Sequence, residues 1–560
     1  MNFYKEDPNL RFILEKYLDL DFLDWADKEL TAFGELCANE IDERAVHTDR
    51  EGQPRLIKYD RMGNDISHVW VNEGYKKTVE QTYNAGIVGY VHKPIPELNR
   101  KGNYMYSYAQ GYLLSHTEPG FYCPVTLTMA TAYLIDHYAD EELKSKFLPH
   151  VLSTGEVELF EGATFLTERQ GGSDVGANEV KAVLEDGQYR IYGEKYFASN
   201  AGQCGVAMVL ARREGAPAGT KGLSLFLVPW RKENKELNHL EIRRLKDKLG
   251  VKAVPSAEVV FHGAEAYLVG DATKGFYYMM EALNLSRICN AIASVGIMQR
   301  AYLEARNYAS TRNTFGSYLI DFPMVKESLV KLAVKQEVET SAVFSLISLF
   351  DQVSSNPEKV SKEDEAMNRL LIALLKMESA EQAVHFCHES IEMHGGNGYI
   401  EDFVMPRLLR DAQVLTVWEG TANILGLEVL RLIEKFKAHE LFLQHIQKEL
   451  NALPEKLQPY TAPILKGLEQ LKEQLVFLSK GNRDVQTYHS KRVAKLMTKI
   501  YESIIALKDA EIGGERKELI ARVFLNETWQ LNAVVDEELL ALKHFDKIVR
   551  VSSENEVVTN

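Results

Sequence analysis

The sequence predicts an α+β protein in which a small β domain lies between helical domains, and three observations predict it. Apolar residues first recur at helical spacing, short β-rich runs separated by turn signals then replace them, and long helical patterns finally return. We therefore expect an N-terminal helical domain over 1–155, a central antiparallel β barrel or sandwich over 156–270, a long-helix bundle over 271–437 and an additional helical domain over 438–560.

The N-terminal part is predicted to be mostly helical. Leu10–Phe22 and Leu143–Leu152 carry apolar residues at the spacing of one helix face. Between them, the polar and Tyr-rich stretch Tyr104–Tyr112 has no clear period, so its structure stays open.

The central part is predicted to be a β domain because its apolar runs are short and turn signals separate them. Val180–Leu184 and Tyr189–Tyr192 flank the sequence Glu-Asp-Gly-Gln, which is typical of a hairpin because Gly accepts a positive φ. Further strands are expected over Val206–Ala211, Leu223–Val228 and Glu258–Phe261. No helical pattern separates these runs, so we expect a barrel or sandwich and not a Rossmann unit.

Long helices are predicted for most of the second half. Tyr277–Ala309 is long enough to cross a domain, and Leu329–Phe350 and Met367–His394 follow it, which favours a helical bundle. After about residue 440, a further helical stretch is punctuated by prolines and by the Gly513-Gly514 pair. We assign this stretch to a separate domain.

Composition excludes several classes of protein. The chain has 560 residues, of which 45% are hydrophobic and 26% charged, as in an ordinary globular protein of several domains. No apolar run approaches the length of a membrane helix and the N-terminus lacks a signal or transit pattern, so we expect no membrane span and a cytoplasmic location. The five cysteines form no CxxC pair, which argues against a disulfide framework or a structural zinc site.

The charge distribution bears on nucleic-acid binding. A net charge of −15 argues against general affinity for phosphates, and the charges nearly balance after residue 430. Lys491, Lys495 and Lys499 form one basic stripe, which is typical of a solvated helix face. We therefore do not expect nucleic acid as a partner.

Two segments far apart in the chain carry the chemistry. Thr167–Asp174 is a Gly-rich loop after a predicted strand, and such a loop lets the backbone approach a polar ligand. Val417–Asn423 places Glu419 beside Trp418. An apolar setting raises the pKa of a carboxylate toward neutrality, as a general base requires. Glu419 is therefore a candidate base, although the residues alone fit an ordinary carboxylate near a helix start at least as well.

Five ordered motifs lie between about residues 100 and 430: Leu166–Ala177, Glu194–Asn200, Arg312–Gly316, Met393–Tyr399, and Arg410-Asp411 followed by Trp418–Thr421. Together they resemble the signatures of the acyl-CoA dehydrogenase family, except that Phe165 stands where a smaller residue is usual. Phe121–Pro124, Leu245–Gly250 and the additional C-terminal domain are most similar to the AidB-type branch of that family.

The resemblance implies an oxidoreductase of fatty acid metabolism that carries out FAD-dependent α,β-dehydrogenation of an acyl-CoA thioester. Glu419 would remove the α-proton while the β-hydrogen passes as hydride to flavin N5. Some members carry the base on the earlier long helix, just before an Arg. That position is Ser286 here, before Arg287, and Ser is no base at this pH, which favours Glu419. The resemblance also implies a homotetramer that passes electrons to an electron-transfer flavoprotein, and we expect medium to long acyl chains.

The resemblance assigns two sets of site residues. The FAD site would comprise Phe165, Thr167, Phe197, Ser199, Arg312, Phe315, Gly395, Gly396, Thr421 and Asn423. The substrate site would comprise Ser173, Arg287 and Trp418. From the residues alone, Ser173 fits a capping Ser nearly as well.

Each FAD contact would have a distinct physical role. Thr167 and Ser199 would donate hydroxyl hydrogen bonds to the flavin ring, and Phe197 would cover one of its faces. Arg312 would meet the FAD pyrophosphate of a neighbouring subunit, a task that suits guanidinium. The glycine pair after His394 lets the backbone approach the pyrophosphate closely. From the residues alone, Thr167 fits an ordinary strand residue, Phe197 fits the core, and Arg312 fits a surface arginine.

One residue departs from the family pattern, and two other interpretations stay open. Glu392 stands where Gln is common and would face the pyrophosphate with like charge, so either it turns away or FAD binds differently. His385, Cys387 and His388 do not share one helix face, so we expect no metal site. The alternatives are an AidB-like flavoprotein associated with nucleic acid and an acyl-lipid-binding protein, each with little dehydrogenase turnover.

Overall fold

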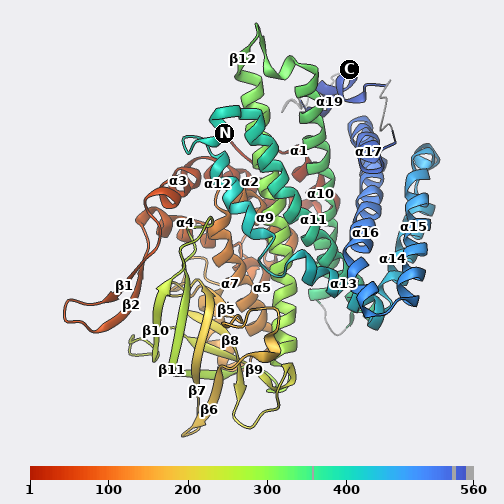
Figure 1. The fold of residues 1–560 in the computed structure, drawn as a ribbon. Helices are drawn as coiled ribbons and strands as arrows, with labels where there is room; N and C mark the ends of the chain where they lie inside the picture. The colour runs from red at the N-terminus through yellow and green to blue at the C-terminus, as the bar shows by residue number, and fades with distance from the viewer. Residues whose placement is uncertain (356–358, 532–537, 550–560) are drawn as a thin grey trace. The chain divides into compact units, whose positions relative to one another are not determined.

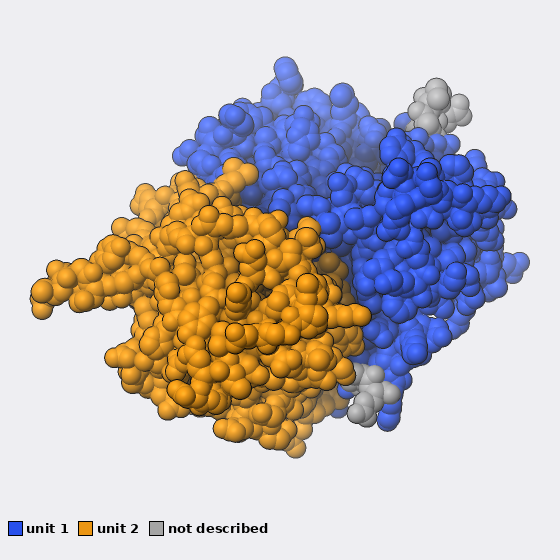
Figure 2. Space-filling view, turned by 60° about the horizontal axis from the view of Figure 1, so that its bottom comes forward, with its two compact units in different colours: residues 1–35, 290–560 blue, residues 36–289 orange. Residues whose placement is uncertain are grey.

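The computed structural model describes residues 1–355, 359–531 and 538–549, which Figure 1 shows as a ribbon. The chain forms two compact units, one of residues 36–289 and one of residues 1–35 with 290–560 (Figure 2). Among the described helices, none combines the length and the apolarity needed to cross a membrane.

Three helices of unit 36–289 begin at polar caps, namely α4 (Glu73–Asn84), α6 (Tyr104–Ser115) and α8 (Glu141–Val151). The side chain of Asn72 accepts a hydrogen bond from the Tyr75 amide at the start of α4, and Asp140 does the same for Leu143 at the start of α8. Every residue of α6 is buried, which explains why its sequence has no amphipathic period. The helices are α3 (Asp42–Arg50), α4 (Glu73–Asn84), α5 (Gly89–His92), α6 (Tyr104–Ser115), α7 (Pro119–Tyr138), α8 (Glu141–Val151) and the first part of α9 (Gly275–Thr311).

Two hairpins interrupt the N-terminal helices, which the sequence analysis did not predict. Strand β1 (Arg55–Tyr59) pairs antiparallel with β2 (Asp65–Trp70). The side chain of Asp60 accepts hydrogen bonds from the amides of Met62 and Asn64, so one carboxylate closes the turn. The second hairpin consists of β3 (Pro94–Ile95) and β4 (Arg100–Lys101).

The predicted hairpin in the central part is confirmed. Strands β6 and β7 pair antiparallel with Glu185 opposite Gln188, and the turn residues Asp186 and Gly187 have φ of 49° and 81°. The strands of this part are β5 (Gly162–Phe165), β6 (Lys181–Glu185), β7 (Gln188–Ser199), β8 (Val206–Arg213), β9 (Leu223–Pro229), β10 (Leu240–Leu245) and β11 (Ser256–Leu268).

The pairing of these strands closes a barrel. Strand β11 pairs with β7, β7 with β6, β6 with β8, β8 with β9, and β9 again with β11, while β10 and β5 extend the sheet. Most pairs are antiparallel as predicted, but β5 and β6 each pair parallel with β8. The predicted α+β fold class is thus confirmed, with a mixed rather than a purely antiparallel sheet.

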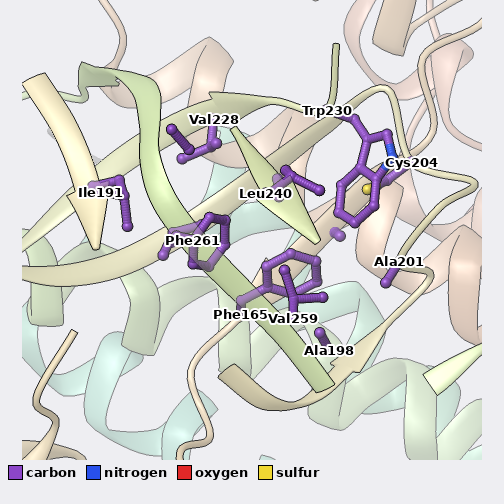
Figure 3. Packing of buried hydrophobic residues seen from close by; sticks show 14 of the residues in the cluster. Phe165, Ile191, Ala198, Ala201, Cys204, Val228, Trp230, Leu240, Val259 and Phe261 are labelled. Carbon is purple, nitrogen blue, oxygen red and sulfur yellow. The ribbon is translucent and has the colours of Figure 1, made fainter. Parts of the chain in front are cut away.

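Apolar side chains from the strands fill the core of the β part (Figure 3). Phe165, Val259 and Phe261 meet there, and Trp230 lies beside Cys204. The side chain of Phe165 is 1% exposed. Because this side chain is buried in the core, only the backbone of Phe165 can make the contact with FAD that the sequence analysis expects.

The second unit is built from long helices, as predicted. Helices α10, α11, α16 and α17 lie side by side (Figure 1). The described helices are α1 (Pro8–Tyr17), α2 (Leu20–Leu36, of which 20–35 belong to this unit), the rest of α9, α10 (Pro323–Ser355), α11 (Lys362–His394), α12 (Met405–Leu415), α13 (Ala422–Phe436), α14 (Ala438–Ala452), α15 (Ala462–Lys480), α16 (Arg483–Ile512), α17 (Gly514–Trp529), α18 (Leu540–Lys543) and α19 (Phe545–Val549).

The helical pattern predicted over Leu10–Phe22 forms two helices instead of one. Leu18 is extended, with ψ of 144°, and the side chain of Asp19 then accepts a hydrogen bond from the Phe22 amide to begin α2. A capping carboxylate that can bond to the backbone locally outweighs continuous apolar spacing here.

A buried ionic cluster joins the two ends of the chain within this unit. Glu337 of α10 lies 2.9 Å from the Lys517 ammonium of α17 and also pairs with Arg516. Its backbone carbonyl accepts a hydrogen bond of 3.3 Å from Asn9 of α1. Burial raises the pKa of Glu337, but Arg516 and Lys517 outweigh burial and lower the pKa to about 2. Helices α1, α10 and α17 are therefore tied together at one residue, Glu337, whose carbonyl bonds to α1 and whose carboxylate pairs with α17.

Candidate functional site

A buried ion pair holds the loop that carries Thr167 in place. The Lys195 ammonium, with no exposed side-chain surface, lies 2.8 Å from Glu168 Oε1 and donates to the Leu166 carbonyl at 3.1 Å. Glu168 also accepts hydrogen bonds from the amides of Glu179 and Val180. Because burial disfavours its charged form, the pKa of Lys195 is lowered. The pair holds both neighbours of Thr167 and so fixes the position of that residue.

The strand next to this loop presents an aromatic ring and a hydroxyl. The Tyr196 amide donates to the Thr167 carbonyl at 2.9 Å, which joins the loop to β7. Along β7, Ala198 points into the core while Phe197 is 53% exposed and Ser199 half-buried. The Ser199 hydroxyl lies 3.2 Å from that of Ser256. Thr167, Phe197 and Ser199 therefore belong to one connected part of the β domain.

The residues expected to meet substrate in this unit differ in exposure. Ser173 is exposed in the loop after Gly171, whose φ is 113° and beside which a Cβ would meet no atom within 4 Å. Arg287 of α9 is buried, and its Nη1 donates to Asn284 Oδ1 at 3.3 Å. Ser173 is thus accessible, whereas Arg287 is held within its own helix.

In the other unit, Glu419 lies in the turn between α12 and α13. Its φ is 60°, a left-handed backbone conformation that is uncommon for a residue with a side chain. The Lys376 ammonium of α11, on a residue 1% exposed, donates to the Gly420 carbonyl at 2.7 Å and anchors the turn. Strained backbone held by surrounding contacts is concentrated at functional sites.

The surroundings of Glu419 modify the expectation of a buried acid. Glu419 and Trp418 are half-buried, and the carboxylate oxygen Oε2 of Glu419 is hidden from solvent. Thr421, not Glu419, is the N-cap of α13, so Glu419 is not a helix-start carboxylate. The turn instead presents one partly hidden carboxylate on the residue that follows Trp418 in sequence.

Arg312 and Phe315 lie on a short projecting hairpin. Strands β12 (Asn313–Thr314) and β13 (Ser317–Tyr318) flank Phe315 and Gly316, whose φ values are 52° and 83°. Phe315 is 95% exposed and Arg312 is exposed beside it. An almost fully exposed aromatic residue on a tight turn is a notable apolar surface for a folded protein.

The glycine-rich end of α11 leaves its backbone accessible. Gly395 has φ of 59°, and a Cβ at Gly395 or at Gly396 would meet no atom within 4 Å. Glu392 is exposed and lies 3.6 Å from His388, so its carboxylate has a neighbouring imidazole. Thr421 and Asn423 are exposed at the start of α13.

The three residues that the sequence analysis weighed as metal ligands do not converge. Cys387 is buried, and burial raises the pKa of its thiol, whereas the side chains of His385 and His388 are 55% and 59% exposed. The described residues do place ligand atoms of His388, Glu389 and Glu392 within 4.8 Å of one another on the exposed face of α11.

Two buried lysines near the site residues were not among the predicted ones. Lys195 supports the Thr167 loop and Lys376 supports the Glu419 turn. Lys376 carries a detectable signal, because a lysine within an apolar run such as Leu374-Leu375-Lys376-Met377 is seldom buried without a partner. Lys195 follows Glu194 and carries no such signal.

Three family models match consecutive parts of the chain. The adaptive response protein AidB N-terminal domain matches residues 1–155, the acyl-CoA dehydrogenase middle domain matches residues 163–264, and the acyl-CoA dehydrogenase C-terminal domain matches residues 273–433.

Individual proteins are similar over most of their length. Acyl-CoA dehydrogenase family member 11 of Caenorhabditis elegans is 31% identical over 535 residues, which cover 91% of this chain and 84% of that protein. The putative acyl-CoA dehydrogenase AidB of Escherichia coli (strain K12) is 31% identical, with coverage of 68% and 69%. The crystal structure of Caenorhabditis elegans ACDH-11 in complex with C11-CoA has a TM-score of 0.86 at 28% identity and covers 99% of this chain and 95% of that one.

Proposed function

The chain belongs to the acyl-CoA dehydrogenase family, and on this premise we propose that it catalyses FAD-dependent α,β-dehydrogenation of an acyl-CoA thioester with Glu419 as the base. The observation that carries the proposal is the turn itself. It holds a glutamate at a φ of 60°, beside Trp418, and a buried lysine anchors it. Such a turn fixes the direction of one carboxylate, as removal of a particular proton requires.

The residues of each unit fit a part of FAD. In unit 36–289, the exposed ring of Phe197 and the hydroxyls of Thr167 and Ser199 suit a planar heterocycle with polar edges. In the other unit, the open space at Gly395 and Gly396 suits the close approach of a pyrophosphate. When bound, FAD supplies the acceptor for the β-hydride.

The side chains of the chain supply the proton chemistry and the positioning. A Glu419 oxygen accepts the α-proton, so that the substrate Cα–H bond breaks and a carboxyl O–H bond forms. Trp418, the residue before Glu419, limits the access of water to this carboxylate. The Thr167 and Ser199 hydroxyls donate hydrogen bonds where negative charge develops.

Assembly, electron transfer and chain length complete the proposal. The exposed Arg312 and Phe315 serve the FAD of a neighbouring subunit in a homotetramer, which gives the projecting hairpin an apolar partner. The electron acceptor is an electron-transfer flavoprotein. The similar Caenorhabditis elegans structure is a complex with C11-CoA, and on that ground we propose medium to long acyl chains within fatty acid metabolism.

The test is anaerobic bleaching of the flavin absorbance by acyl-CoAs of increasing chain length. Glu419→Gln should retain FAD and lose roughly three orders of magnitude in bleaching rate, because general-base catalysis is worth about 10²–10⁴. The control is Glu455→Gln, which removes an exposed carboxylate remote in sequence. Bleaching at the full rate by Glu419→Gln would remove that residue from its role. Salt-dependent nucleic-acid binding, or tight acyl binding, without bleaching of the unaltered protein would instead favour the alternatives.

A further inference from the structure

A cavity of about 430 Å³ lies within the helical unit, lined by Thr416 and Ala422, which flank the Glu419 turn. Its walls come from α11, from the turn at Thr416, from the start of α13 and from α16 of the additional C-terminal helices. Its size is that of an ordinary small-molecule site. The cavity therefore lies near the proposed base, Glu419. None of its lining residues is among the FAD-binding or substrate-binding residues named above.

The cavity gathers positive charge. Lys376, Lys491, Arg492 and Lys495 line it, against one carboxylate, Glu381. That carboxylate pairs with Lys495 at 3.0 Å. Among the described residues, no carboxylate lies within ion-pair distance of Lys491 or Arg492. Convergence of like charges is unfavourable unless an anion offsets it.

In a second cavity, of about 760 Å³, carboxylates of the protein neutralise a lysine. It lies between α10, α11, α16 and α17. There the Lys335 ammonium is within 3.0 Å of carboxylate oxygens of Glu339, Glu378 and Glu502, so the protein itself supplies the counter-charge. In the smaller cavity, the Lys495 ammonium pairs with Glu381, but Lys491 and Arg492 have no such carboxylate partner among the described residues.

The rest of the smaller cavity is apolar. Met377 and Ala380 of α11 and Leu425 of α13 contribute to its lining. Ala422, the first residue of α13, adds the partial positive charge of a helix N-terminus. A ligand that satisfies this lining carries a compact, multiply charged anion on a small apolar body. A phosphate monoester fits this description, because guanidinium and ammonium groups bind its oxygens with charge-assisted hydrogen bonds.

We propose that this cavity binds a small phosphate monoester and that the bound anion stabilises the turn that holds Glu419. Lys376 makes the connection, since it lines the cavity and also donates to the Gly420 carbonyl. Thr416, at the other end of the turn, lines the cavity as well. The binding site does not depend on the proposed function, but its effect on the reaction does.

The binding test uses phenyl phosphate as the probe and the full-length holoprotein, with isothermal titration calorimetry. We expect one site per chain, weaker binding of inorganic phosphate, no binding of benzyl alcohol, and weakening with added salt. The double variant Lys491→Met/Arg492→Met should lose affinity by about tenfold or more, because each charge-assisted contact contributes about that factor. Lys472→Met, an exposed lysine of α15, is the matched control.

The coupling test is hydrogen exchange of the amides of residues 416–421, followed by mass spectrometry. Phenyl phosphate should slow this exchange in the unaltered protein and in Lys472→Met, but not in the double variant. The absence of phenyl phosphate binding, or equal binding by the double variant, would overturn the site. Binding without any change in exchange would overturn the coupling. Neither readout needs dehydrogenase turnover, so failure here is distinct from failure of the proposed function.

Discussion

Glu161 offers a sharp test of the electrostatics of the β-rich unit. Its side chain is 5% exposed at the entry to β5, and Oε1 accepts a hydrogen bond of 2.9 Å from the Tyr83 hydroxyl. Burial raises the pKa of Glu161 from 4.5 to about 7, and the Tyr83 hydrogen bond offsets only part of that rise. The folded protein therefore holds a proton on Glu161 at pH values where the unfolded chain does not.

The sign and size of the effect follow from proton linkage. Between pH 4.5 and about 7 the native state binds one more proton than the unfolded state, so the free energy of unfolding falls as pH rises. At about 1.4 kcal/mol per pKa unit, the loss reaches roughly 3 kcal/mol and is complete above the folded-state pKa. Glu161→Gln, which stays neutral and keeps a hydrogen-bond acceptor, should remove this pH-dependent loss.

The assay is chemical denaturation of the unaltered protein and of Glu161→Gln from pH 5 to pH 8. We expect the stability advantage of the variant to grow by about 3 kcal/mol across this range. Glu158→Gln, at an exposed position three residues earlier, is the control and should show no such growth. Infrared spectra should show a protonated carboxyl band that titrates near pH 7 and is absent from Glu161→Gln. Parallel stability curves together with no such band would refute the reasoning.

Three further perturbations address other parts of the molecule. Arg312→Ala should lower the FAD retained per chain on gel filtration, since an exposed guanidinium is removed from the proposed pyrophosphate contact; unchanged flavin content would contradict this. Lys376→Met should slow flavin bleaching about tenfold or more with FAD content preserved, because the Gly420 carbonyl loses its donor; an unaltered rate would show that the turn is held without it. Glu337→Gln should lower the free energy of unfolding by roughly 3 kcal/mol at pH 7, because the pKa of Glu337 is lowered to about 2 in the folded protein. The stability that the Glu337 carboxylate contributes is present above pH 4.5 and is lost as the pH falls toward 2. Urea midpoints that do not move would exclude this contribution.

The parts of the fold that the sequence predicted share one property, which is a signal within the local sequence, either a long helical pattern or a turn residue. The long helices and the hairpin around Gly187 are of this kind. Helix α6 is not, because every one of its residues is buried and no face differs from another. Strand β5 has only four residues, and its parallel pairing with β8 depends on distant chain segments that local patterns do not encode.

For the candidate site, as for the fold, local sequence predicts some features and leaves out others. The motifs predicted a set of site residues, and the structure connects three of them, Thr167, Phe197 and Ser199, through the loop and β7. The motifs could not give the left-handed backbone of Glu419, which tertiary contacts impose on a residue that does not favour it. Nor could they give the bond from Lys376, because its acceptor is a backbone carbonyl 44 residues away in the sequence.

The contact between Asn9 and Glu337 has a consequence for the order in which the protein is completed during synthesis. The unit of residues 36–289 is continuous in sequence and can fold once it leaves the ribosome. Helix α1 must wait for α10, and the Glu337 carboxylate of α10 acquires Lys517 only after a further 180 residues have been made. Helix α1 is therefore secured only after helices far along the sequence have been made, so we expect the nascent chain to depend on chaperones around α1.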